Sequence, residues 1–390
     1  MSSATSSDIV AAVASVVGDA RPVSLHEPLF AGNEAAYVNA CIVEGWVSSV
    51  GAFVDRFETE LAAACGAKHA VVLVNGTCAL HAALTVSGVL PGDEVLVPSL
   101  TFVATANAVS HAGAIPHFVE VEEASLGIDP AALKTYLEQI ATLKGGYAVN
   151  KHTGRIIRAL VPVHVFGHPC RLDELKFVAD AWNLLFIEDA TEALGSVCRG
   201  KNIGSEHTAI FSFNGNKILT TGGGGAIVTQ DTAFYRRVKH LTSTAKEPHK
   251  WAFSHDAIGW NYRLPNLNAA LGCAQLEQLP RFLQAKRALA RHYMQAFEGM
   301  DGMRILREPE GTQSNYWLVT LLAGKDDSAW LNGTLNALHT AGLLCRPIWN
   351  PLHTLPIYAD CPKADLRLTE NLSRRIISLP SSVRLGLAYA

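Results

Sequence analysis

The chain has 390 residues, a formal net charge of -3, a hydrophobic fraction of 49% and a charged fraction of 17%, which together are typical of a soluble globular protein. This length is sufficient for two domains with large cores. The slightly acidic balance without any Lys/Arg run argues against a nucleic-acid-binding surface, and no apolar run approaches the roughly 18 residues of a membrane-spanning helix.

The N-terminal segment 1–21 contains an apolar run that no positive charge precedes and that Asp8 and Asp19 bracket. A secretory signal is therefore not expected, and a short amphipathic helix is predicted instead. The eight cysteines form no C-x-x-C pair and lie mostly among apolar residues. This pattern predicts buried free thiols and a cytoplasmic location.

Between residues 70 and 230, short β-branched apolar runs alternate with helical patterns, as at 77–88, 101–112 and 171–182. Nearly continuous apolar runs are typical of strands that are buried on both faces of a parallel sheet. A loop rather than a helix separates the last two runs, which permits one antiparallel strand. The seven predicted strands are 70–74, 94–98, 115–121, 157–163, 184–189, 208–213 and 225–229.

The pattern changes after residue 250, where a long helical stretch over 268–300 precedes a strand-like run at 316–323. We therefore expect an α/β fold with two domains. The larger, over residues 1–250, would contain a mostly parallel seven-stranded sheet and the N-terminal helical segment. The smaller C-terminal α/β domain would cover residues 251–390.

Ligands bind at the carboxyl ends of the strands in such a sheet, and polar residues follow three of the predicted strands. Gly76 and Thr77 open a helix after the first strand, where free amides and the helix dipole favour an anion. The alternative is a plain helix capped by Asn75 or Thr77. Asp189 ends the fifth strand, where a buried carboxylate needs a cationic partner unless it is a helix N-cap.

Ser212 and Lys217 follow the sixth strand, and Lys217 precedes the glycine run 222–225. The phosphate loop of nucleoside triphosphatases has the reverse order, with lysine after the glycines. An anion site, a carboxylate and a lysine together fit pyridoxal 5'-phosphate, which has a phosphate, a protonatable ring nitrogen and an aldehyde. The glycines would let the backbone pass close to this cofactor, or would form a flexible turn.

Four segments resemble the DegT/StrS-type sugar-nucleotide aminotransferases, which have the aspartate aminotransferase fold, called PLP fold type I. The resemblance extends over nearly the whole chain, from residue 25 to residue 383. It is greatest to the subgroup that aminates keto-sugar nucleotides on the way to bacillosamine or legionaminic acid. The segments are NGT (75–77), EDATEALGS (188–196), SFNGNK (212–217) with its glycine run, and GWNYRLPNLNAALGCAQLE (259–277).

This resemblance implies a role for each matched residue. Lys217 would form the Schiff base with the cofactor and would also be the general base, and Asp189 would pair with the pyridinium nitrogen. The phosphate would be held by Gly76, Thr77 and Ser212.

Further matched residues would surround the cofactor ring and the substrate. Phe102 would stack on the ring, and Glu192, where many relatives have glutamine or histidine, would lie near the phenolic oxygen. Asn261 would reach the phosphate of a neighbouring subunit, which implies a homodimer with shared sites. The predicted contacts to the sugar nucleotide are Trp46, Ser48, Tyr316 and His353.

The implied reaction moves an amino group from glutamate to a keto sugar. The expected acceptor carbon is C4 of a UDP- or GDP-linked 4-keto-6-deoxy hexose, with or without a 2-acetamido group, in surface-glycan biosynthesis. Two alternatives stay open: amination of an acidic eight-carbon keto sugar, and a non-catalytic regulatory protein on the same fold. A related sugar dehydratase is disfavoured, because such relatives have histidine in place of Lys217.

Two other patterns bear on function. The segment 164–170 (HVFGHPC) lacks the paired spacings of a zinc site, and we predict packing and lining of the cofactor pocket rather than a metal there. An amino-acid aminotransferase would need an arginine to anchor two successive carboxylate substrates. Aromatic and polar segments at 45–51, 259–266 and 346–353 suit a sugar and a base instead. The last arginines lie in no motif that can be assigned to anchoring a carboxylate: Arg367, Arg374, Arg375 and Arg384.

Overall fold

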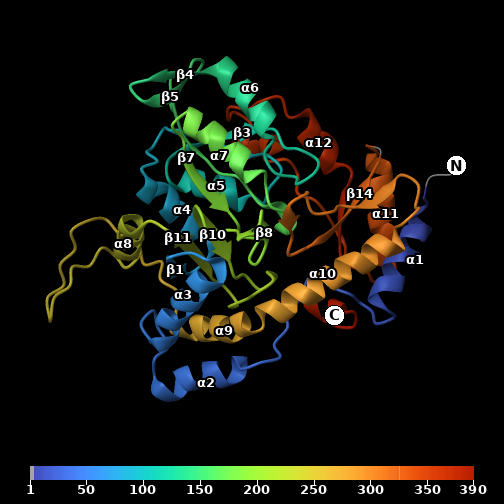
Figure 1. Cartoon of the computed structure of the whole chain (residues 1–390), viewed down its shortest axis with the longest axis horizontal. Helices are drawn as coiled ribbons and strands as arrows, with labels where there is room; N and C mark the ends of the chain where they lie inside the picture. Colours follow the sequence, from blue (N-terminus) through green and yellow to red (C-terminus); the bar gives the residue numbers. More distant parts are fainter. Residues whose placement is uncertain (1–3, 325) are drawn as a thin grey trace.

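The computed structural model describes residues 4–324 and 326–390, which form a large central sheet between two layers of helices and a second sheet built from the C-terminal part (Figure 1). All seven predicted strands belong to the nine-stranded central sheet. They lie side by side in the order β1 (His69–Leu73), β11 (Gly225–Thr229), β10 (Thr208–Ser212), β7 (Leu185–Asp189), β6 (Ile156–Leu160), β2 (Glu94–Pro98) and β3 (Ile115–Val119).

The strand directions confirm a mostly parallel centre with an antiparallel member. Parallel pairing joins β10 to β7, β7 to β6, β6 to β2 and β2 to β3. Strand β11 runs antiparallel between β1 and β10. This is the strand that the sequence places after a loop, and a loop without a helix suffices because antiparallel neighbours need no crossover.

Two strands of the sheet are not among the predicted ones. β4 (Ala141–Lys144) and β5 (Tyr147–Asn150) form a hairpin whose second strand pairs with β6. The turn contains Gly145 and Gly146, which have φ values of 57° and 83°. A Gly-Gly pair between two short strands is a hairpin signal, because both turn residues need positive φ.

The central strands are mostly apolar because helices cover both faces of the sheet. In β1, Ala70 and Val72 belong to one core cluster, and Val71 and Leu73 belong to the other. Successive side chains of a strand point to opposite faces, so both faces must be buried. The first cluster includes residues of α3 (Ala52–Cys65), α6 (Pro130–Ile140), α7 (Leu172–Ala181) and α9 (Asn266–Glu277), and the second includes residues of α4 (Gly76–Ser87), α5 (Ala104–His111) and α8 (Thr232–Leu241).

The C-terminal part forms its own antiparallel sheet in the order β12 (Met303–Ile305), β14 (Val319–Ala323), β16 (Ile376–Leu379) and β15 (Arg346–Pro347). Helices α10 (Leu279–Ala296), α11 (Ser328–Thr340) and α1 (Ser6–Val17) surround a core around Tyr293 and Leu321. Helix α1 begins at the capping box of Thr5 and Asp8, as expected of an amphipathic N-terminal helix. The remaining elements are α2 (Glu34–Glu44), β8 (Val197–Cys198), β9 (Lys201–Asn202), β13 (Thr312–Gln313), α12 (Arg367–Ser373), α13 (Val383–Gly386) and the 3₁₀ turns η1 (Val165–Gly167), η2 (Leu352–Thr354) and η3 (Pro356–Tyr358).

The division into two domains at residue 250 stays a proposal, and packing joins some segments across it. Helix α1 packs against α10 and α11, whereas α9 packs against α2 and α3 (Figure 1). A boundary drawn by packing would therefore assign α1 to the smaller domain and α9 to the larger one. Among the described residues, no helix combines the length and apolar character needed to cross a bilayer.

The sheet order brings three carboxyl ends together. Strands β1 and β10 both run antiparallel to β11, and β7 runs parallel to β10. The segments that follow Leu73, Asp189 and Ser212 therefore emerge at the same edge of the sheet. This is the edge where open α/β sheets bind ligands.

Candidate active site

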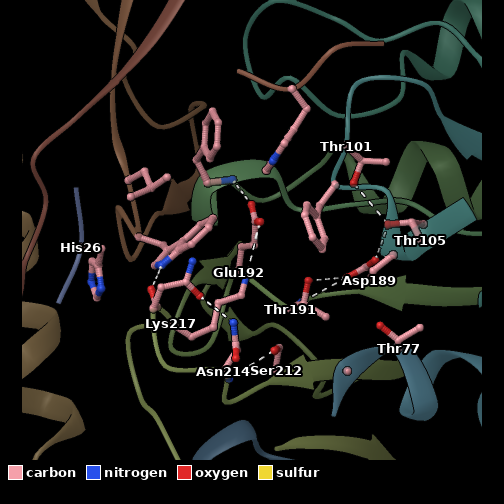
Figure 2. Close-up of a pocket in the computed structure, with 18 of the residues that line it drawn as sticks. His26, Thr77, Thr101, Thr105, Asp189, Thr191, Glu192, Ser212, Asn214 and Lys217 are labelled. Carbon is pink, nitrogen blue, oxygen red and sulfur yellow. Dashed lines mark hydrogen bonds and ion pairs between the residues drawn. The ribbon is translucent and has the colours of Figure 1, made fainter. Parts of the chain in front are cut away.

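A cavity of about 660 Å³ lies at this edge of the sheet (Figure 2). Its lining combines segments that follow the strands with residues from the C-terminal part and from the chain before α2. The predicted residues that line it are Gly76, Thr77, Phe102, Asp189, Glu192, Ser212 and Lys217.

Lys217 lies in the turned segment after β10, where its amide donates to the Asn214 carbonyl at 3.0 Å. Its Nζ is 3.2 Å from Glu192 Oε1 and 3.8 Å from the centroid of the Trp317 ring. The Trp317 indole N–H donates to the Asn216 carbonyl at 2.7 Å, which fixes the ring beneath the amine. An aromatic face and a carboxylate thus hold the Lys217 amine in one place.

Asp189 ends β7, and hydroxyl groups fix its carboxylate. Thr105 Oγ1 donates to Oδ2 at 2.8 Å, and Thr191 Oγ1 donates to Oδ1 at 2.8 Å. The Thr191 amide also donates to Oδ1, at 3.2 Å. Asp189 is 4% exposed and has no cationic side chain bonded to it among the described residues. A buried carboxylate of this kind is available to a cationic group of a ligand.

The first turn of α4 forms an anion site beside Ser212. The Asn75 side chain caps the helix by accepting from the Cys78 amide at 2.7 Å. The amides of Gly76 and Thr77 precede that bond, and amides in a first helical turn have no acceptor within the helix. A Cβ on Gly76 would lie 3.2 Å from Ser212 Cβ and from Thr191 Cγ2. Glycine therefore keeps the space between these side chains open.

Phe102 and Glu192 contribute opposite kinds of surface. Phe102 is 53% exposed in the cavity wall, 6.5 Å from the Trp349 ring between centroids. Glu192 is buried, and its Oε2 accepts from the Phe166 amide at 2.8 Å. Burial raises the pKa of Glu192, although Lys217 acts in the opposite direction.

The glycine run has two effects. Gly223 and Gly224 line the cavity, and a Cβ on Gly225 would lie 2.4 Å from the carbonyl carbon of Asn75. No side chain fits that gap, because β11 passes close to the start of α4. The run therefore permits a close backbone approach, and only Gly222 among the four has a positive φ, of 80°.

Three predicted residues lie outside the cavity of their own chain. Trp46, Ser48 and Asn261 are exposed, and none of them lines the main cavity. Asn261 instead lines a separate hollow together with Ser49 and Val50. Within one chain, therefore, these residues cannot contact a ligand beside Lys217.

Two further predicted contacts are buried elsewhere, and the structure corrects them. Tyr316 is 3% exposed and its hydroxyl accepts from the Glu308 amide at 3.1 Å, whereas its neighbour Trp317 faces the cavity. His353 is 7% exposed and bonds to the hydroxyl of Ser99 at 2.8 Å. Both side chains are engaged in internal packing and do not line the cavity.

The cavity also contains residues that the sequence did not reveal. Trp317 lies in a run that the sequence predicts only as a strand. Thr105 and Thr191 line the cavity and donate hydrogen bonds to the Asp189 carboxylate. Arg346 also lines the cavity. It belongs to the segment 346–353, whose aromatic and polar residues are expected to suit a sugar and a base. No pattern in the sequence marks His26, which reaches the cavity from the chain before α2.

The segment 164–170 packs internally, as predicted. His164 Nε2 lies 3.1 Å from Glu188 Oε2, and the Cys170 amide donates to His164 Nδ1 at 3.1 Å. These residues are buried. Among the described residues, no group of three or more His, Cys, Asp or Glu side chains is arranged to hold a metal.

A lysine, a buried carboxylate and a helix N-terminus line one cavity at the carboxyl edge of such a sheet, which is the arrangement of an enzyme active site that binds an anionic ligand. The sequence profile of the DegT/DnrJ/EryC1/StrS aminotransferase family matches residues 29–389. The chain therefore belongs to the DegT/DnrJ/EryC1/StrS family and is a sugar aminotransferase.

Relatives and solved structures agree with this assignment. The chain is 36% identical to GDP-perosamine synthase of Vibrio cholerae, over 92% of this chain and 94% of that protein. It is 33% identical to dTDP-3-amino-3,4,6-trideoxy-alpha-D-glucose transaminase of Streptomyces venezuelae, over 91% and 88%. The crystal structure of S. venezuelae DesV with a ketimine intermediate superimposes with a TM-score of 0.81, at 31% identity and 91% coverage of both chains.

Proposed function

We propose that this enzyme uses pyridoxal 5'-phosphate to transfer an amino group from glutamate to C4 of a nucleotide-linked 4-keto-6-deoxy hexose. The observation that carries this proposal is the single cavity that joins the Lys217 amine, the Asp189 carboxylate and the anion site of α4. GDP-perosamine synthase among the relatives supports a GDP-linked acceptor. The resemblance to the bacillosamine and legionaminic acid subgroup supports a UDP-linked one.

The residues present fit this cofactor. The open space at Gly76, the first-turn amides of α4 and the Ser212 hydroxyl would hold its phosphate. Asp189 would pair with the ring nitrogen, Phe102 would stack on the ring, and Glu192 would lie near the phenolic oxygen. When bound, pyridoxal 5'-phosphate supplies an electrophilic carbon and a ring that withdraws electrons from the adjacent reacting carbon.

Lys217 would be the nucleophile toward the cofactor and, once free, the base that moves a proton at the substrate carbon. Trp317 and Glu192 hold the Lys217 amine in position, so that it is already oriented for proton transfer. Glu192 is a buried hydrogen-bonding group beside the Lys217 amine, and burial raises the pKa of its carboxyl group. This property suits a position at which many relatives have glutamine or histidine.

The preference for a sugar acceptor can be measured with the aminated form of the enzyme. We expect a nucleotide-linked 4-keto-6-deoxy sugar to react at least about a hundredfold more efficiently than pyruvate or oxaloacetate, a difference of about 2.7 kcal/mol in transition-state binding. The aromatic cavity surface of Phe102, Trp317 and Trp349 supports this expectation. Single-turnover loss of the aminated-cofactor absorbance with each acceptor gives the ratio.

Faster reaction with a simple keto acid would contradict the sugar assignment and leave the transaminase activity intact. Preferential reaction with an acidic eight-carbon keto sugar would select the first alternative. If no acceptor reacts although the cofactor is bound, the chain would be the non-catalytic regulatory protein.

A homodimer with shared sites is part of the proposal. Asn261 is exposed and lies outside its own chain's cavity, and Trp251, Phe253 and Ile258 in the segment before it are 74%, 80% and 94% exposed. Exposed apolar side chains in a cluster are typical of interaction sites. These features support a contact in which Asn261 reaches the phosphate in the partner's cavity.

Subunit mixing tests this contact. Asn261→Ala and Lys217→Ala subunits should each be impaired, whereas exchange between them should restore about one quarter of wild-type activity, because half of the dimers would be hybrids with one intact site. The measurement is turnover before and after exchange. Absence of recovery, with exchange verified by mass, would favour self-contained sites.

The cytoplasmic location also remains a proposal. All eight cysteines are free, and five of them are buried. Burial raises the pKa of the Cys65 and Cys345 thiols to about 12, which keeps them protonated and unreactive. Unpaired inert thiols support a reducing compartment.

A further inference from the structure

The wall of the cavity that the C-terminal sheet provides contains an arginine with no partner. Arg346 lies in the edge strand β15, and its Cα is paired with that of Ser378 in β16. Cross-strand partners have their side chains on the same face of a sheet, and both Arg346 and Ser378 line the cavity. Within residues 4–324 and 326–390, the Arg346 guanidinium has no ion pair and no hydrogen bond.

The four arginines nearest the end of the chain differ from Arg346. Each is paired with a carboxylate and none lines the cavity: Arg367 with Asp365, Arg374 with Asp326, Arg375 with Glu123 and Arg384 with Glu27. These pairs explain why no arginine in that stretch is available to a substrate. The arginine that is available lies earlier in the chain.

His26 is a second residue of the cavity wall whose polar atoms have no partner among the described residues. Both of its ring nitrogens are shielded from solvent and have no hydrogen-bond partner among the described residues. Burial lowers the pKa of His26 well below its usual value, and Lys286 and Lys217 lower it further. Shielded polar atoms without partners are unfavourable until a ligand bonds to them. Figure 2 shows His26 on the side of Lys217 that faces away from Asp189 and Thr77.

The α4 anion site and the Arg346 guanidinium suit different parts of the chemistry. The amides of α4 and the Ser212 hydroxyl suit a phosphate monoester, whereas a planar guanidinium with five N–H donors matches a carboxylate in a two-bond geometry. An amino-acid donor has a carboxylate on the carbon that bears the reacting amine. In a sugar that is aminated at C4, the diphosphate on C1 lies across the ring from the reacting carbon.

Resting on the proposed function, we propose that Arg346 binds the carboxylate of the amino-acid donor. An oxyanion could also come from the diphosphate of the acceptor. The experiment therefore measures the two sources separately.

Glutarate, a dicarboxylate without an amine, would be titrated into the purified holoenzyme by calorimetry, and GDP and UDP would be titrated in parallel. We expect Arg346→Gln to weaken glutarate binding roughly 10- to 100-fold, the loss typical of hydrogen bonds to a charged group, with nucleotide binding unchanged. Arg346→Lys keeps the charge without the two-bond geometry and should weaken glutarate less. The matched control is Arg367→Gln, since Arg367 is exposed and paired outside the cavity.

A readout without any variant uses phenylglyoxal, which modifies guanidinium groups. Glutarate should slow modification of the peptide that contains Arg346 in the wild-type protein. Unchanged glutarate affinity in a folded Arg346→Gln variant, or no protection in the wild type, would overturn the proposal. Weakened GDP or UDP binding with glutarate binding unchanged would also overturn it.

These outcomes are distinguishable from failure of the proposed function. If glutarate binding depends on Arg346 while no keto-sugar nucleotide reacts, the acceptor assignment fails and the carboxylate site stands. If keto-sugar nucleotides react well while glutarate binding does not depend on Arg346, the aminotransferase assignment stands and this inference fails.

Discussion

Lys217→Ala is expected to reduce turnover by roughly four orders of magnitude or more, because it removes the nucleophile and the base together. No other lysine lines the cavity, so no side chain in the described residues can take over either task. Borohydride treatment of the wild-type protein should fix the cofactor to the peptide that contains Lys217, and the variant should retain no covalent label. Steady-state turnover and peptide mapping measure the two effects.

The matched control is Lys201→Ala, which removes an exposed lysine of β9 that pairs with Glu206 and does not line the cavity. This variant should retain the label and the wild-type rate. A label on a lysine other than Lys217 would contradict the assignment, whatever the rate of the alanine variant.

Asp189→Asn is expected to lower turnover roughly 10- to 100-fold or more, and the variant should retain some cofactor. Loss of a charged hydrogen bond costs about 1.5 to 3 kcal/mol, and loss of the protonated ring nitrogen would add to the barrier. The amide oxygen could still accept from one of the two threonine hydroxyls, of Thr105 or Thr191, and the NH2 group could donate to the other, so the local structure should persist. Turnover, cofactor content and the thermal midpoint would be measured on the same preparation.

Glu188→Gln serves as the neighbouring control, because Glu188 pairs with His164 in the interior and does not line the cavity. We expect Glu188→Gln to lower the thermal midpoint and to leave turnover close to that of the wild type. Near-normal turnover of Asp189→Asn would mean that this carboxylate only organises the turn after β7.

The sequence by itself determined the central sheet and the residues at its carboxyl edge. Nearly continuous apolar runs identify strands that are buried on both faces, and in such a sheet the polar residues after β1, β7 and β10 must emerge together. Six of the seven predicted site residues that line the cavity end or follow these strands, and the seventh, Phe102, follows the parallel strand β2. The hairpin β4–β5 is not among the predicted strands, although its Gly-Gly turn is a recognisable hairpin signal.

The C-terminal contacts could not be found in this way, because a motif does not say which of its side chains faces the cavity. The chain turns at Tyr316, which has a φ of 48° and precedes β14, so Trp317 faces the cavity while Tyr316 is buried. In the segment 346–353, Arg346 lies on the cavity face of β15, whereas His353 bonds to Ser99.

Only the tertiary structure decided that Arg346, Trp317 and His26 share a cavity with Lys217. These residues come from the C-terminal sheet and from the chain before α2, and they meet the central sheet through packing between distant segments. Local periodicity follows from backbone geometry and can be deduced from a short stretch of sequence. Contacts between distant segments depend on how whole elements pack, and no short stretch contains that information.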